Sequence, residues 1–113
     1  MSDCIFCKII DGEIPADKIY EDEHLIAFND LSPQAPVHVL VIPKKHIAST
    51  EDLLEDDAPI MGHIMTKIKD IAKLVGITNG YRLVINCGED GQQTVPHLHI
   101  HLLGKRSLQW PPG

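Results

Sequence analysis

The chain has 113 residues with a formal net charge of −6, and 43% of its residues are hydrophobic, which is typical of one soluble globular domain over residues 1–113. The acidic balance argues against a nucleic-acid partner, and there is no run of about 20 apolar residues to cross a membrane. The N-terminus lacks the basic and apolar regions of a signal peptide, so we expect a cytoplasmic protein. Three cysteines are too few for a disulfide framework.

The N-terminal half predicts one short helix and three strands. The helix covers Cys4–Ile10 and ends at Asp11-Gly12. The strands are expected at Ile19–Glu21, Leu25–Asn29 and Val37–Ile42. The last of them is an apolar, β-branched run that Pro43 stops, so it is expected to be buried.

A long helix is the clearest element of the C-terminal half. Asp57 is expected as its N-cap, Pro59 fits its first turn, and apolar residues recur every three or four positions up to a C-cap at Gly76. The remaining elements are two strands and the polar turn between them, at Tyr81–Cys87, Val95–Leu103 and Gly88–Gln93. The pattern predicts an α+β fold with an antiparallel sheet of about five strands, covered by helices. Residues 106–113 would form a C-terminal tail.

Three histidines alternate with apolar residues in the last predicted strand: His97, His99 and His101. Alternate side chains of a strand share a face, so the imidazoles are expected on one face, roughly 7 Å apart. The outer two would be too far apart to share a metal ion. A neutral imidazole is a nucleophile near pH 7, and a protonated neighbour can donate to phosphate oxygens. The loop over residues 88–94, with glycines and amides such as Gln93, is expected to approach the phosphate.

The histidine string resembles the signature of the histidine triad family of nucleotide hydrolases and transferases. Four further segments resemble the nucleotide-binding protein branch of that family: residues 30–38 (DLSPQAPVH), 41–46 (VIPKKH), 80–82 (GYR) and 108–113 (LQWPPG). Together they span nearly the whole chain. The resemblance implies an antiparallel sheet with helices, and a homodimer in which the sheets of two subunits join.

The resemblance also implies catalytic roles. His99 would be the nucleophile that becomes adenylylated, with its other ring nitrogen held by the backbone carbonyl of His97. His101 would contact the phosphate oxygens. Thr94 stands where this branch commonly has a serine that bonds the leaving group, and Asn86 would contact the phosphate or the leaving-group region.

Nucleotide-binding residues follow from the same resemblance. Asp30 would bind the ribose hydroxyls, for which a carboxylate is a suitable acceptor. An apolar slot around a purine base, or plain core packing, is expected for four residues: Phe6, Ile9, Phe28 and Leu31. The tail would carry Trp110 towards the active site of the partner subunit.

Cys4 and Cys7 form a C-x-x-C pair at the start of the chain. Half-buried thiols, a redox pair and metal ligands are the open interpretations, although a redox site is expected near a βαβ pattern, which this chain lacks. Family members with this pair bind zinc, and the resemblance implies His46 and His97 as the other two ligands. Four protein ligands would fill every coordination position of a tetrahedral zinc ion and leave none for water, so the zinc would be structural. No organic cofactor is expected.

We therefore expect hydrolysis of purine nucleoside 5′-phosphoramidates through a nucleotidyl–His99 intermediate, with an AMP or GMP moiety as the bound nucleotide. Hydrolysis of dinucleoside polyphosphates and nucleotidyl transfer are alternatives, although the transferase branch usually has glutamine at the position of His101. Two further alternatives are a nucleotide-binding regulatory protein with vestigial catalysis and a metal-dependent hydrolase. The presence of all three histidines favours catalysis, because nucleotide binding alone needs no uncharged imidazole aimed at phosphorus.

Overall fold

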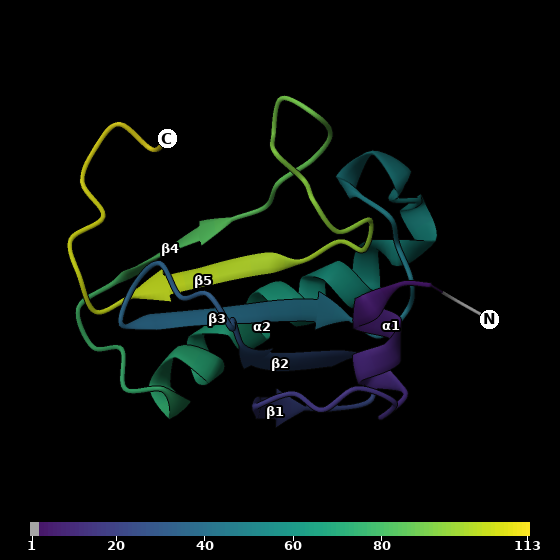
Figure 1. Ribbon diagram of the computed structural model, residues 1–113, viewed down its shortest axis with the longest axis horizontal. Coiled ribbons are helices and arrows are strands. Elements are labelled where there is room, and N and C mark those ends of the chain that lie inside the picture. The colour runs from purple at the N-terminus through teal and green to yellow at the C-terminus, as the bar shows by residue number, and fades with distance from the viewer. Residues whose placement is uncertain (1–2) are drawn as a thin grey trace.

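One antiparallel sheet organises the fold, with its five strands in the order β1-β2-β3-β5-β4 (Figure 1). The computed structural model describes residues 3–113. Met1 and Ser2, at the N-terminus where the sequence predicts no signal peptide, lie outside the described residues. The helices and strands are α1 (Ile5–Ile10), β1 (Lys18–Glu21), β2 (Leu25–Asn29), β3 (Val37–Pro43), α2 (Ala58–Leu74), β4 (Tyr81–Val84) and β5 (Ile100–Gly104). Two short 3-10 turns, η1 (Thr50–Asp52) and η2 (Glu55–Asp57), precede α2. The predicted α+β architecture is confirmed.

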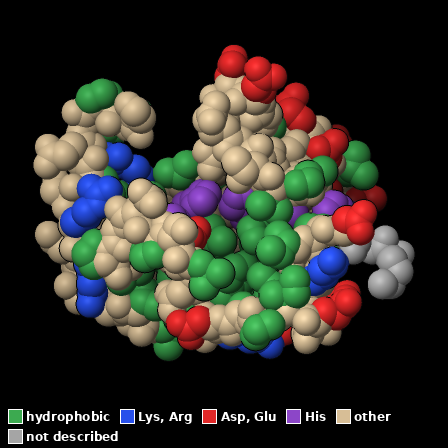
Figure 2. Space-filling model, in the orientation of Figure 1, with side chains coloured by type: hydrophobic (Ala, Val, Ile, Leu, Met, Phe, Trp, Pro, Cys, Tyr) green, Lys and Arg blue, Asp and Glu red, His purple; other side chains and the backbone are tan. Residues whose placement is uncertain are grey.

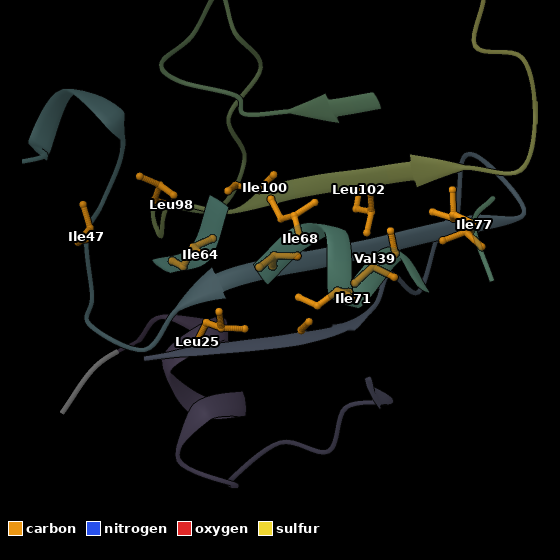
Figure 3. Close-up of a cluster of buried hydrophobic side chains, with 14 residues drawn as sticks. Leu25, Val39, Ile47, Ile64, Ile68, Ile71, Ile77, Leu98, Ile100 and Leu102 are labelled. Carbon is orange, nitrogen blue, oxygen red and sulfur yellow. The ribbon is translucent and has the colours of Figure 1, made fainter. Parts of the chain in front are cut away.

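The long helix α2 covers one face of the sheet, and α1 lies on the opposite side (Figure 1). Ile64, Ile68 and Ile71 of α2 are almost fully buried, and their spacing of three and four residues places them on one side of the helix. They pack against alternate residues of β3 and β5, among them Val39 and Leu102 (Figure 3). Alternation in the strands therefore sends one set of side chains into this core and the other set towards α1.

The last strand differs from its prediction. It begins at Ile100, not at Val95: its ladder with β3 starts at the pair Val41–Ile100, while Ile42 and Pro43 of β3 pair with β2. Pro96 also has no N–H to give to a ladder. Likewise β4 ends at Val84 and does not extend to Cys87. His97 and His99 thus stand on irregular backbone that precedes the strand, which allows their rings to turn apart.

The ends of α2 are only partly as predicted. Pro59 lies in the first turn and Gly76, with a φ of 78°, follows the C-cap residue Val75. Asp57 precedes the helix but makes no capping hydrogen bond to it. Its buried carboxylate instead accepts from the backbone N–H of Leu54 and from Lys45. Over residues 3–113, no helix combines the length and apolarity that crossing a bilayer requires.

Candidate active site

The side chain of His99 is held in a single tautomer by a backbone contact. Its Nδ1 lies 2.7 Å from the carbonyl oxygen of His97. A carbonyl oxygen only accepts hydrogen bonds, so Nδ1 carries the proton and Nε2 keeps a lone pair. The ring is buried, 5% exposed, and packs edge-on against Phe6 at a centroid distance of 5.1 Å. The arrangement gives one imidazole a fixed orientation and a nucleophilic nitrogen.

His101, on β5, is held by a histidine of the neighbouring strand. Nε2 of His38 lies 2.9 Å from Nδ1 of His101, and Nδ1 of His38 accepts the backbone N–H of Gln34 at 3.0 Å. Because Nδ1 of His38 is an acceptor, its Nε2 carries the proton and donates to His101. Nδ1 of His101 is then the acceptor and its Nε2 carries a proton. This second ring nitrogen can donate to a phosphate oxygen without any positive charge on the ring.

Burial keeps His101 uncharged. It lowers the pKa of this imidazole to about 4, and the neighbouring His99 and His38 lower it further, against the opposing effect of Asp30. Burial also lowers the pKa of His38. His101 is therefore a neutral imidazole in the free protein, whereas the expectation from the sequence was a protonated ring. A bound phosphate would favour protonation, because its negative charge lies beside the ring.

An apolar pocket of about 270 Å³ lies between α1 and the sheet. All four residues of the predicted base slot line it: Phe6, Ile9, Phe28 and Leu31. Leu31 is 97% exposed, so a ligand in the pocket would cover apolar surface that is now in water. Asp30 is at the same pocket, where its Oδ1 accepts the backbone N–H of Ser32 and its Oδ2 lies 3.6 Å from Nε2 of His38. Asp30 thus lies between this apolar pocket, which no histidine of residues 3–113 lines, and the hydrogen-bonded pair of His38 and His101.

Four side chains from three segments meet beside α1. Nδ1 of His97 lies 3.4 Å from Sγ of Cys4 and 3.6 Å from Sγ of Cys7, and Nδ1 of His46 lies 3.2 Å from Cys7 and 3.1 Å from His97. Cys4 is the N-cap residue of α1 and Cys7 lies one turn on, so both sulfurs face the same way. The four ligand atoms lie within 4.8 Å of one another.

These separations fit a tetrahedral zinc ion. Bonds of about 2.0 Å to nitrogen and 2.3 Å to sulfur place neighbouring ligand atoms about 3.3 to 3.8 Å apart. Nε2 of His97 lies 2.8 Å from the carbonyl oxygen of Pro43, so this nitrogen carries the proton and Nδ1 has its lone pair free for a metal. Two cysteines and two histidines are also the donor set of a closed structural site.

Sequence comparison places the chain in a family. A family model described as "Scavenger mRNA decapping enzyme C-term binding" matches residues 3–110. An uncharacterized HIT-like protein of Synechococcus elongatus is 57% identical over 111 residues, which cover 98% of this chain and 97% of that protein. The chain belongs to the histidine triad (HIT) family.

Solved structures of other HIT proteins share the fold. A HIT family hydrolase from Legionella pneumophila superposes with a TM-score of 0.94 at 49% identity, covering 98% of this chain and all of that one. A histidine triad nucleotide-binding protein from Candida albicans gives a TM-score of 0.79 at 34% identity, covering 98% of this chain and 85% of that one. In both comparisons the shared fold spans nearly the whole chain.

The loop before the histidines of this HIT protein is braced by its own amides. Asn86 donates through Nδ2 to the carbonyl of Gly91 at 2.6 Å. Gln93 accepts the N–H of Gly88 and donates to the carbonyls of Ala48 and Val95. These predicted phosphate contacts therefore hold the loop in shape. Thr94 is exposed.

The tail is bound to the protein's own β4. Arg82 donates to the backbone carbonyls of Leu108 and Gln109, and its guanidinium lies 6.0 Å from the ring of Trp110. Trp110 is 80% exposed and is absent from the lining of the apolar pocket. Histidine side chains form the floor of a hollow between this tail and the loop over residues 88–94 (Figure 2).

His38 is the site residue that sequence reasoning left without a role. It occurs in the DLSPQAPVH segment, but its partner His101 is 63 positions away in the chain. A signal was present, because His38 is the only polar side chain in the run from Val37 to Pro43. A buried polar side chain requires a partner, and only the pairing of β3 with β5 shows which one it is.

Proposed function

We propose that this HIT protein hydrolyses purine nucleoside 5′-phosphoramidates, with His99 as the nucleophile. The observation that carries the proposal is the hydrogen bond from Nδ1 of His99 to the His97 carbonyl, which places the proton of the neutral ring on Nδ1 and makes Nε2 the nitrogen with the lone pair. The neighbouring ring of His101 is 5.1 Å away between centroids and offers an N–H donor. The apolar pocket with Asp30 at its rim suits a purine and a ribose.

The proposed reaction has two displacements at the α-phosphorus. Nε2 of His99 bonds to phosphorus as the P–N bond breaks, and the departing amine takes up a proton from the solvent. Water then attacks the same phosphorus and gives up a proton to the solvent as the bond between phosphorus and Nε2 breaks, which releases the nucleoside monophosphate and returns His99 to its neutral state. The N–H of His101 donates to the phosphate oxygens as charge develops. Thr94 would bond the leaving group, and Asp30 would bind the ribose hydroxyls.

A single-turnover assay tests the proposal. The panel contains adenosine and guanosine phosphoramidates of a primary amine, with diadenosine polyphosphates for the alternative hydrolysis. We expect wild type to cleave the phosphoramidates and to carry a covalent nucleotide on His99 after acid quench. His99→Ala should lose about 10⁴-fold or more in rate, as removal of other catalytic nucleophiles does, while His24→Ala, an exposed histidine on another loop, should match wild type. Equal cleavage by His99→Ala would refute the nucleophile.

We further propose that Cys4, Cys7, His46 and His97 hold a structural zinc ion. It would pin α1, and with it Phe6 and Ile9 of the pocket, beside the histidines. Metal analysis of the purified protein should give one zinc per chain, and Cys7→Ser should lose it. Hydrolysis by the zinc-free protein at low temperature should persist, because the metal has no open position for water. Purified protein that contains no zinc, or Cys7→Ser protein that binds it as wild type does, would contradict this assignment.

A homodimer is proposed through the edge of the sheet. β4 is an edge strand, and Tyr81 and the adjacent Ile85 are 44% and 39% exposed. Unpaired edges that carry apolar side chains favour strand pairing with a second chain. Trp110 of one subunit would then be available to the site of the other. Sedimentation equilibrium should give twice the chain mass, and a monomeric protein at micromolar concentration would refute the dimer.

A further inference from the structure

A second cavity lies at the end of the sheet, away from the histidines. It has a volume of about 620 Å³, more than twice that of the apolar pocket, and it opens where β5 ends and β4 begins. Two segments line it, residues 76–80 and residues 105–107. None of the residues proposed for catalysis, nucleotide binding or zinc is among them.

The cavity is basic in an acidic protein. Lys105 and Arg106 line it and no carboxylate does, although the chain has 16 acidic and 10 basic residues. Within residues 3–113, neither cation is within ion-pair distance of a carboxylate. The Arg106 guanidinium donates to the backbone carbonyls of Gln34 and Ser107, which orient it but leave its charge unneutralised. Lys and Arg side chains gather at the end of the molecule beneath the tail (Figure 2). An unneutralised pair of cations in a concave site attracts anions.

The backbone at Lys105 is strained. Its φ of 67° is in the left-handed region, which disfavours any side chain with a Cβ. The lysine side chain folds over Gly76, where a Cβ would lie only 3.1 Å from Nζ. The ammonium group therefore reaches the cavity because a strained residue lies opposite a glycine.

We propose that this cavity binds the phosphate group of a small organic phosphate. Lys105 and Arg106 supply the charge, and the polar side chains of Thr78, Asn79 and Ser107 line the same space. Arg and Lys next to hydroxyl and amide donors suit a tetrahedral oxyanion. The volume exceeds what the phosphate alone needs, which leaves room for the organic part. The site is independent of the proposed hydrolysis.

Residue-resolved NMR titration tests the site on the full chain. Amide signals of Gly76, Gly80 and Ser107 should shift saturably with ribose 5-phosphate, and also with inorganic phosphate at higher concentration. Equal affinity for the two would assign the site to free phosphate. Sodium acetate at matched ionic strength should leave these signals in place. Shifts that do not saturate, or that acetate reproduces, would overturn the proposal.

Lys105→Gly separates binding from folding. Glycine removes the charge and suits the left-handed backbone, so the melting temperature should not fall. The affinity for ribose 5-phosphate should drop at least 10-fold, whereas Lys69→Ala, which removes a lysine from α2, should bind as wild type does. A lower melting temperature with unchanged affinity would mean that Lys105 only complements the C-terminal end of α2, and the proposal would fail.

Discussion

The two faces of the sheet are built on different principles. The face under α2 is closed by apolar side chains alone, and its cluster includes Leu25, Val41, Ile68 and Ile100. The face towards α1 buries three histidines: His38, His97 and His99. Every one of these rings has a hydrogen-bonding partner, and none of the buried side-chain nitrogen or oxygen atoms over residues 3–113 lacks one.

The two faces of the sheet serve different purposes: the face under α2 stabilises the fold, and the face towards α1 carries the reactive side chains. Apolar packing under α2 is non-directional and stabilises the sheet as a whole. The histidines on the other face contribute little hydrophobic energy, but their hydrogen bonds fix tautomers and orientations that a nucleophile and a phosphate donor need. One strand, β5, serves both faces, because its residues alternate between the core and the histidine side. Changes on the two faces should therefore affect different measurements.

The largest effect on folding is expected from Ile68→Ala. Ile68 is 1% exposed in the α2 core, and truncation of such a residue costs about 2 to 5 kcal/mol. Denaturant unfolding should show this loss, with kcat of the folded protein unchanged. Leu31→Ala on the other face is the matched control, since this leucine is 97% exposed: it should keep the stability and raise KM. A reversed pattern would contradict the division between the faces.

Chelation should affect only the α1 side. With the proposed zinc removed, α1 would be held by apolar contacts of Phe6 and Ile9 alone. We expect hydrogen-exchange protection of Lys8 to Ile10 to fall by about 10- to 100-fold, because metal binding is part of the folding energy of such a segment. Protection at Ile68 should stay the same. Equal loss in both helices would mean that the metal stabilises the whole fold.

The sequence predicts the α2 core better than the histidine side, for physical reasons. The period of Ile64, Ile68 and Ile71 and the apolar run of β3 define their elements by themselves, and both are confirmed. No comparable local pattern determines the conformation of the segment that carries the three histidines. Period-two alternation predicts a strand through His97, but a strand needs a paired partner, and the ladder with β3 stops at the pair Val41–Ile100.

Contacts between distant segments are the other limit of prediction from sequence. The base-slot residues come from α1, β2 and the following loop, and their common pocket is a property of the tertiary fold. The amides of Asn86 and Gln93 bond to backbone carbonyls of Gly91 and Ala48, and no local sequence pattern predicts these partners. The role of His38 depends on the register between β3 and β5. The resemblance named most of these residues because it carries tertiary information that composition and periodicity lack.

A smaller effect is expected from His38, which we predict to be a positioning residue for His101. His38→Leu removes the donor to Nδ1 of His101 and should lower kcat about 10-fold, the effect of one buried hydrogen bond. His38→Gln can still donate and should recover part of the rate. The ¹⁵N shifts of His101 should report the Nε2–H tautomer in wild type and a mixture in His38→Leu. An unchanged tautomer with reduced kcat would assign His38 a packing role only.

The smallest effect is expected far from both sites, at Asp22. Burial raises the pKa of this carboxyl, but hydrogen bonds from the His24 and Leu25 backbone, His63 and Tyr20 outweigh it, so the folded pKa lies well below the ordinary value. A carboxyl with a depressed folded pKa stabilises the protein above its unfolded pKa of about 3.9, and this stabilisation is lost as the pH falls towards the folded value. Asp22→Asn should cost about 1 kcal/mol at pH 7 and less at pH 3. Urea unfolding of wild type and Asp22→Asn at both pH values measures this loss of stability. A loss that is the same at pH 7 and pH 3 would show that the charge of the carboxyl does not contribute to the contact between Asp22 and His63 of α2.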